Sequence, residues 1–463
     1  MPKLLFTDGV DASARARISY SFATWCAVYG YAEDDGVILT YGADIPAAYV
    51  PRDLGTAIAA PRLITRTVRG REISVPVFYQ HGDAVDWLGE CFEWLSGQEE
   101  RFTAARDAIG RVPYAATLNG RFDLDPLTPW AAVMLAAFNE SVRASVGAHW
   151  REHPSPPFSR GERFVVQASH DVDYLPTRPW LDCWRLAKNM VDAGRSGGLA
   201  AAVAIAGQAL RSWWRRGCLV DGLARLVDDE QQRGITADYN LIVRRAHRRD
   251  ADYRIADAGI RRQLAGIRSA GSCVGVHGSY ESLGRRGRLA AEYARVRQHY
   301  PARGGRQHWL RWHGDVLFDE LVQAGSQWDG TIGFPERPGF RWGACFPFLP
   351  YDFAREAPYP LLELPLMLMD TALVAAAPTG NARSELTTAI MEQARHWGWG
   401  GCGVLWHDTV TGGYQLPADV PHLYWQGLDQ ADGAWSGDRI HAAVWPRYRA
   451  SFARWLAQGE DAA

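Results

Sequence analysis

Two aspartates follow a short apolar run near the middle of the chain. The run 164–169 leads directly into His170-Asp171-Val172-Asp173. Asp171 and Asp173 are two positions apart, so at the end of an extended strand both carboxylates can face the same side. One can then ligate a divalent metal ion while the other takes a proton from water. Asp-x-Asp also occurs in helix caps and turns, so this prediction depends on the polar groups that follow.

Histidines and an arginine follow later strand-like runs. His277 ends the apolar run 272–277, where a neutral imidazole can bind a metal or serve as an ordinary core histidine. Arg306 and His308 are two apart, so on a strand Arg306 can hold a carboxylate while His308 faces a metal. His407 ends the late run 403–406 and is well placed to act as a general acid.

Three further residues are candidate substrate contacts. Tyr280 and Trp309 follow His277 and His308 closely, and Arg341 lies in a glycine-containing segment, 339–348. The chain has 20 tryptophans, and aromatic rings near such a site can stack on sugars, although most tryptophans simply fill cores. We expect Tyr280, Trp309 and Arg341 to contact the substrate.

Strand-like and helix-like segments alternate through the second part of the chain. We expect strands at 164–169, 237–243, 272–277, 307–312, 361–366 and 403–406, and helices at 180–232, 256–269, 286–300 and 383–397. This order predicts a parallel α/β sheet or barrel. The carboxyl ends of its strands would bring the polar groups together.

The first part of the chain is predicted to be a smaller α/β domain. We expect strands at 36–42 and 73–79, a helix at 83–96 capped by Asp83, and a helix at 129–146. A segment with three prolines, 153–160, would connect residues 1–152 to the domain at 160–463. No metal-ligand spacing or phosphate-binding loop is present in the first part.

The composition excludes several classes of function. The 463 residues carry a net charge of −2, which does not favour nucleic-acid binding. Seven cysteines without a CxxC pair indicate reduced thiols, and the N-terminal apolar run is too short for a signal peptide, so we expect a cytoplasmic protein. No apolar run is long enough for stable membrane insertion. The oligomeric state stays open.

The motifs together resemble the metal-dependent polysaccharide deacetylases of the chitin-deacetylase and nodulation-deacetylase type. The resemblance covers residues 160–463 and is closest to a bacterial branch with the motif His-Asp-Val-Asp. Residues 92–100 and 107–111 also resemble the domain of unknown function that precedes this branch. The resemblance implies a distorted (β/α) barrel of about seven strands.

The resemblance also implies roles for individual residues. Asp171 would be the general base, Arg306 would orient it, and His407 would be the general acid. Asp173 and His277 would bind one divalent ion, which we expect to be Zn²⁺. The family usually has a second histidine four residues after the first, and Glu281 stands there.

Three residues are therefore candidates for the third ligand. They are His308, Glu281 and His313, and we favour His308 because imidazole is the commoner ligand. We expect Asp329 or Asp408 to contact the other nitrogen of His407.

These assignments imply a hydrolase that removes an N-acyl group, expected to be N-acetyl, from an amino sugar or glycan precursor. The substrate would be a small molecule or glycan. An amidohydrolase acting on a non-sugar amide is the alternative within enzymes, because the same chemistry serves any small N-acyl group. A catalytically silent carbohydrate-binding protein is the alternative outside them.

Overall fold

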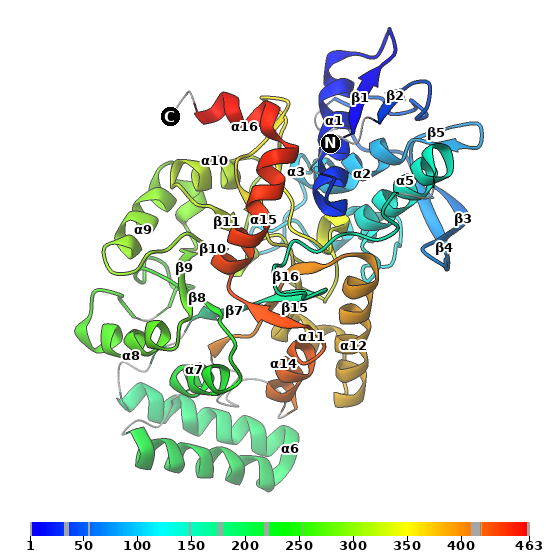
Figure 1. Ribbon diagram of the computed structural model, residues 1–463. Coiled ribbons are helices and arrows are strands. Elements are labelled where there is room, and N and C mark those ends of the chain that lie inside the picture. The colour runs from blue at the N-terminus through cyan, green and yellow to red at the C-terminus, as the bar shows by residue number, and fades with distance from the viewer. Residues whose placement is uncertain are drawn as a thin grey trace.

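One large parallel sheet organises the computed structural model (Figure 1). The structure describes residues 2–31, 37–53, 56–147, 150–173, 175, 179–216, 222–251, 253–408, 417 and 419–460. The strands of the large sheet follow the order β14-β11-β10-β9-β8-β7-β16-β15, and β17 pairs with the start of β7. Their bounds are β7 (Val165–Val172), β8 (Asp238–Leu241), β9 (Cys273–Gly278), β10 (Gly304–Gln307), β11 (Trp328–Asp329), β14 (Leu362–Glu363), β15 (Leu366–Met369), β16 (Gly400–Leu405) and β17 (Gly433–Trp435).

The two edge strands of this sheet belong to one short segment of chain. β14 pairs with β11, and β15 pairs with β16 at the opposite edge. Between them, the Leu364 amide donates to the Asp329 carbonyl at 2.8 Å, and the Gly403 amide donates to the Pro365 carbonyl at 2.9 Å. The sheet is therefore curled into a barrel-like form. This confirms the predicted α/β class, with eight strands along the sheet where about seven were expected.

Helices cover the outside of the sheet, as the alternating sequence pattern predicts (Figure 1). They are α6 (Pro179–Arg216), α7 (Gly222–Gln232), α8 (Ala258–Ser269), α9 (Arg288–Arg297), α10 (Val316–Gln323), α11 (Asp370–Ala376), α12 (Gly380–Trp397), α14 (Val420–Leu428), α15 (Gly437–Ser451) and α16 (Ala453–Glu460). Short 3-10 helices η2 (Ser282–Gly284), η3 (His308–Leu310) and η4 (Arg341–Gly343), and the antiparallel pair β12 (Tyr351–Asp352) and β13 (Ala357–Pro358), lie in the connections.

The N-terminal part combines helices with small two-stranded sheets. Its helices are α1 (Ala12–Tyr29), α2 (Trp87–Leu95), α3 (Gln98–Arg101), η1 (Tyr114–Ala116), α4 (Leu118–Arg121) and α5 (Trp130–Val146). The parallel pair is β1 (Lys3–Phe6) with β2 (Ile38–Tyr41), and the antiparallel pairs are β3 (Arg62–Val68) with β4 (Arg71–Val77) and β5 (Gln80–His81) with β6 (Ala84–Val85).

This part packs tightly on the sheet domain. One hydrophobic cluster includes Trp25 of α1 and Trp399 next to β16. Across the same contact, the Tyr20 hydroxyl donates to the Leu349 carbonyl at 2.7 Å, and Arg17 pairs with Glu356 at 2.7 Å. Because the apolar core is continuous, the division into residues 1–152 and 160–463 stays a prediction.

Several sequence predictions differ from the structure. Helix α2 begins at Trp87 and its cap is Asp86, which accepts from the Gly89 amide, whereas Asp83 lies in the β5–β6 turn. The predicted strand 307–312 is wrong, because β10 ends at Gln307 and η3 follows. The predicted helix 180–232 is divided into α6 and α7, and 217–221 lie outside the described residues, as does residue 36 of the predicted strand 36–42.

Candidate metal centre and active site

Three polar side chains from neighbouring strands converge at the carboxyl edge of the sheet. Asp173 directly follows β7, His277 lies near the end of β9, and His308 follows β10. Oδ1 of Asp173 lies 3.6 Å from Nε2 of each histidine. Each residue offers one ligand atom, and the three atoms lie within 4.8 Å of one another. A single divalent ion could contact all three.

The surroundings of each residue favour metal binding. Nδ1 of His277 donates to the Arg306 carbonyl at 2.9 Å, which leaves the Nε2 lone pair facing Asp173. Burial lowers the pKa of His277, so its ring is neutral at neutral pH. Oδ1 of Asp173 is buried and, within the described part of the chain, has no hydrogen-bond partner. One carboxylate and two imidazoles form a donor set that fits Zn²⁺.

Asp250 lies next to Nδ1 of His308. Nδ1 of His308 lies 3.5 Å from Oδ1 of Asp250, and that oxygen also accepts from the Tyr280 amide at 2.8 Å. A carboxylate behind a ligating imidazole fixes the ring orientation and makes the ring more basic.

Asp171 lies beside the triad in a different environment. Its Oδ1 accepts from Arg306 at 3.1 Å and from Nδ2 of the Asn240 side chain at 2.9 Å, and its Oδ2 lies 3.7 Å from Nε2 of His277. Burial opposes the charged form of Asp171. The nearby His277 and Arg306 outweigh burial and hold its pKa well below the usual range. This carboxylate is therefore ionised at neutral pH.

The buried Arg306 is fixed by two groups besides Asp171. Its Nε donates to the Gly330 carbonyl at 2.6 Å, and two of its nitrogens lie 3.1 Å from the Ser169 hydroxyl. Arg306 thus contacts the carboxylate of Asp171, and its predicted role in orienting a general base stays a prediction.

His407 completes the group from the other side. Its Nε2 lies 3.8 Å from Oδ2 of Asp173, and its Nδ1 lies 2.8 Å from Oδ1 of Asp370. Burial would lower the pKa of His407, but Asp370, with Asp173 and Asp171 nearby, outweighs burial and raises it to about 10. The ring is therefore protonated at neutral pH.

The expected partners of His407 were wrong. Asp370, at the start of α11, takes the place that we predicted for Asp329 or Asp408. The carboxylate of Asp329 instead accepts from the hydroxyl and amide of Thr331. Asp370 was not among the expected site residues, although it follows the apolar strand β15 in the same way as the other site residues follow theirs.

The backbone next to His308 is strained. Trp309 and Leu310 have φ values of 65° and 52°, in the left-handed region, where non-glycine residues cost about 1–3 kcal/mol each. This turn replaces the predicted strand and leaves the Trp309 side chain 40% exposed, with its ring 5.5 Å from that of His308. Trp309 thus borders the candidate metal centre.

The other two ligand candidates lie elsewhere. Glu281 accepts from Arg288 at 3.0 Å, and His313 is exposed. Among the described residues, neither belongs to the cluster formed by Asp173, His277 and His308.

Two predicted substrate contacts are occupied within the protein. Tyr280 stacks on His247 with ring centroids 4.5 Å apart, and Arg311 lies over the same ring at 4.0 Å. Arg341 is buried, and its Nε donates to Glu100 of α3 at 2.7 Å. Arg341 therefore joins the N-terminal part to the sheet domain, and its predicted contact with substrate stays a prediction, as does that of Tyr280.

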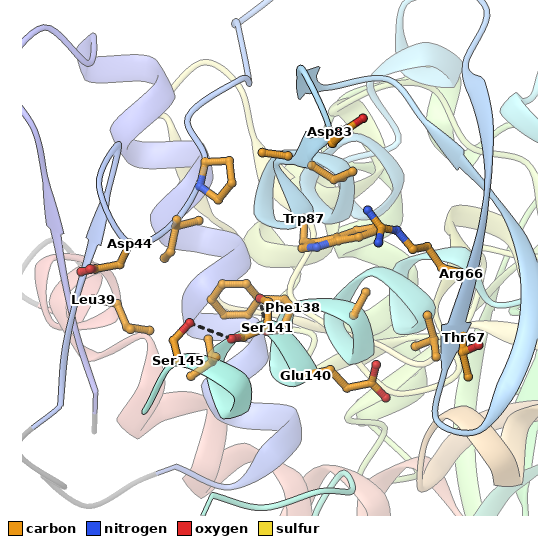
Figure 2. Close-up of a pocket in the computed structure, with 17 residues that line it drawn as sticks. Leu39, Asp44, Arg66, Thr67, Asp83, Trp87, Phe138, Glu140, Ser141 and Ser145 are labelled. Carbon is orange, nitrogen blue, oxygen red and sulfur yellow. Dashed lines mark hydrogen bonds between the residues drawn. The ribbon is translucent and has the colours of Figure 1, made fainter. Parts of the chain in front are cut away.

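A cavity of about 440 Å³ lies in the N-terminal part, apart from these residues. Figure 2 shows that Arg66 and Trp87 face it from one side and Phe138, Ser141 and Ser145 of α5 from another. The candidate metal ligands do not line it.

Comparison with known proteins gives distant structural neighbours only. No family model and no curated protein matches the chain. The crystal structure of Puue allantoinase is 12% identical, with a TM-score of 0.40, and the match covers 63% of this chain and 93% of that one. This likeness is too distant to carry an argument. The fold and site themselves define the class: an α/β barrel-like protein with a candidate metal centre at the carboxyl edge of its sheet.

Proposed function

We propose that the protein is a metal-dependent hydrolase that cleaves an amide bond. The reaction would remove an N-acyl group, expected to be N-acetyl, from an amino sugar or glycan precursor. The observation that carries this proposal is the convergence of Asp173, His277 and His308, with the ionised Asp171 on one side and the protonated His407 on the other. A base and an acid that flank a metal centre are what amide hydrolysis requires.

Asp171 is the proposed general base. A bound divalent ion would polarise the amide carbonyl and lower the pKa of a water. Asp171 then accepts a proton from the attacking water on its Oδ2. Arg306 and Asn240 both contact Oδ1, so they hold the carboxylate in place and leave Oδ2 free to react.

His407 is the proposed general acid. Its Nδ1 proton is held by Asp370, and its Nε2 faces Asp173, so the proton on Nε2 points into the site. This proton passes to the amide nitrogen as the carbon–nitrogen bond breaks, which releases the amine. A protonated His407 at neutral pH suits this role.

The exposed Trp309 supports a sugar substrate. Its indole ring borders His308 and offers a flat apolar surface to the face of a hexose. A carbohydrate-binding protein without activity would need neither the Arg306–Asp171 nor the His407–Asp370 pair. An amidohydrolase for non-sugar amides would need both pairs but not Trp309.

The proposal is tested by metal content and acetate release together. Wild type and the variants Asp173→Ala, His308→Ala and Glu281→Ala are analysed for bound metal and assayed with N-acetylhexosamine substrates. We expect about one divalent ion in wild type, which is lost in Asp173→Ala and His308→Ala because each removes one of three ligands.

Glu281→Ala is the matched control, since it removes a nearby carboxylate that lies outside the cluster. It should retain both metal and activity. Wild type that binds no divalent ion under any loading condition would contradict the proposal. Bound metal without acetate release, but with release of amine from other acylated amides, would favour the non-sugar amidohydrolase.

A further inference from the structure

Exposed apolar side chains are concentrated on α6. Of the thirteen large apolar side chains that are exposed in the described part of the chain, seven lie on this helix. Their exposed fractions are high for residues of this kind: Trp184 59%, Val191 52%, Leu199 80%, Val203 60%, Leu210 66%, Trp213 56% and Trp214 88%. Single exposed apolar residues are common on protein surfaces, but a concentration of this size on one element indicates an interaction surface.

The helix forms a hairpin at the edge of the molecule. Its backbone is non-helical at Gly198, where φ is 75°, and the chain doubles back there (Figure 1). Figure 1 places this hairpin below the sheet and far from the N-terminal elements. Its exposed side chains are therefore unobstructed by the N-terminal part.

The charge of the segment differs from that of the whole chain. Residues 179–216 contain six basic residues, Arg185, Lys188, Arg195, Arg211, Arg215 and Arg216, and two acidic ones, Asp182 and Asp192. The segment therefore carries a formal charge of +4, whereas the whole chain carries −2. A basic segment rich in exposed tryptophan and aliphatic residues is complementary to an anionic lipid surface. A contact between two copies of the hairpin would instead place like charges against each other.

We propose that the α6 hairpin binds the surface of an anionic lipid membrane. Among the described residues, no helix is long and apolar enough to span a membrane, so the hairpin would lie in the interface. Trp213, Trp214 and Leu199 enter the headgroup region, and the positive formal charge of the segment favours anionic lipids. α6 begins shortly after Asp173, so the membrane would lie near the carboxyl edge of the sheet. The proposal does not depend on the proposed hydrolase function.

The hairpin contains a natural position for a probe. Cys183 is exposed on α6, while the other described cysteines are buried or half-buried and Cys218 lies outside the described residues. The full chain with Cys218→Ser is labelled at Cys183 with an environment-sensitive fluorophore. It is then mixed with vesicles of equimolar phosphatidylglycerol and phosphatidylcholine, or of phosphatidylcholine alone. We expect a blue shift and co-sedimentation with the anionic vesicles, both weakened by salt.

Trp213→Ser/Trp214→Ser is the test variant, and Leu63→Ser is the matched control. Leu63 is 57% exposed on β3, so both changes remove exposed apolar area without disturbing the core. The double variant should bind anionic vesicles at least about tenfold more weakly, because it lacks the two indole rings that move from water into the membrane interface on binding. Leu63→Ser should bind like wild type.

Two outcomes would overturn the proposal. One is the absence of wild-type binding to anionic vesicles at low salt. The other is a wild-type dimer in solution that the double variant loses, because a second copy would then cover the hairpin.

Discussion

Buried carboxylates serve different purposes in the two parts of the molecule. In the N-terminal part, Oδ2 of Asp86 accepts from the amides of Ala48 and Tyr49 and from the Tyr41 hydroxyl, and its Oδ1 accepts from Gly89. At the sheet edge, by contrast, Oδ1 of Asp173 is buried without a hydrogen bond among the described residues and faces two imidazoles. A carboxylate whose oxygens all accept hydrogen bonds holds loops together, whereas one with an oxygen that accepts none can still bind a ligand.

The pKa values of Asp86 and Asp171 are shifted in opposite directions. Burial raises the pKa of Asp86, even though four donors oppose the shift. Burial also acts on Asp171, but His277 and Arg306 reverse its effect and lower the pKa. Arg306 beside Asp171 thus favours the ionised carboxylate that the proposed reaction requires.

Replacing each carboxylate by its amide should separate these purposes most strongly. Asp171→Asn should lower kcat/KM by about 10²–10⁴-fold, the usual contribution of a general base, while metal content stays near wild type. Asp86→Asn should keep the activity of the folded protein and lose about 1–3 kcal/mol of stability, because one amide group cannot accept all four hydrogen bonds. Acetate release and thermal unfolding measure the two effects. An equal loss of activity in Asp171→Asn and Asp86→Asn would show that the two carboxylates do not serve different purposes.

The His407–Asp370 pair predicts a smaller and pH-dependent effect. A general acid must be protonated, so activity should fall as the pH rises through the pKa of His407, about 10. Asp370→Asn removes the main group that raises this pKa. The alkaline limb of the kcat/KM profile should then move down by at least about one pH unit, with a loss of about tenfold or more at pH values above the wild-type pKa. Glu281→Gln should leave the profile unchanged. An unshifted limb in Asp370→Asn would exclude His407 as the titrating acid.

Replacement of Asp238, the first residue of β8, should give the smallest effect, and only on stability. Burial and the nearby Asp438 raise its pKa from 3.8 to about 8, against hydrogen bonds from Gly437 and Gln167. The folded state therefore binds this proton more tightly than the unfolded state, so the stabilisation is complete below pH 3.8 and is lost as the pH rises towards 8.

Asp238→Asn should make the midpoint of thermal unfolding less dependent on pH between 5 and 8, a change of a few degrees. Calorimetry over this range measures it. If wild type and Asp238→Asn show the same dependence of the unfolding midpoint on pH, that dependence comes from other groups.

Most of the sheet and much of the site could be predicted from local sequence patterns. Asp171, Asp173 and His277 follow short apolar runs, and parallel strands carry their carboxyl ends to one edge. The alternation of strands and helices is itself a local signal. For this reason the predicted strands at 237–243 and 272–277 agree closely with β8 and β9.

The remaining features depend on contacts that are distant in sequence. His308 was expected on a strand, but the left-handed Trp309 and Leu310 form a turn that tertiary packing stabilises and that residue propensity disfavours. The pairing of Arg341 with Glu100 could not be inferred either, because nothing in a segment rich in glycine and aromatic residues indicates a buried ion pair with a distant helix.

The order of the strands has a consequence for how the protein is made. The candidate ligands Asp173, His277 and His308 follow β7, β9 and β10, which belong to a run of strands consecutive in the sequence and adjacent in the sheet. Asp370 and His407 follow β15 and β16, near the end of the chain. During translation the ligands therefore leave the ribosome well before the acid and its partner. A nascent chain could acquire its ion while still inactive, and hydrolytic competence would arise only when β16 takes its place beside β7.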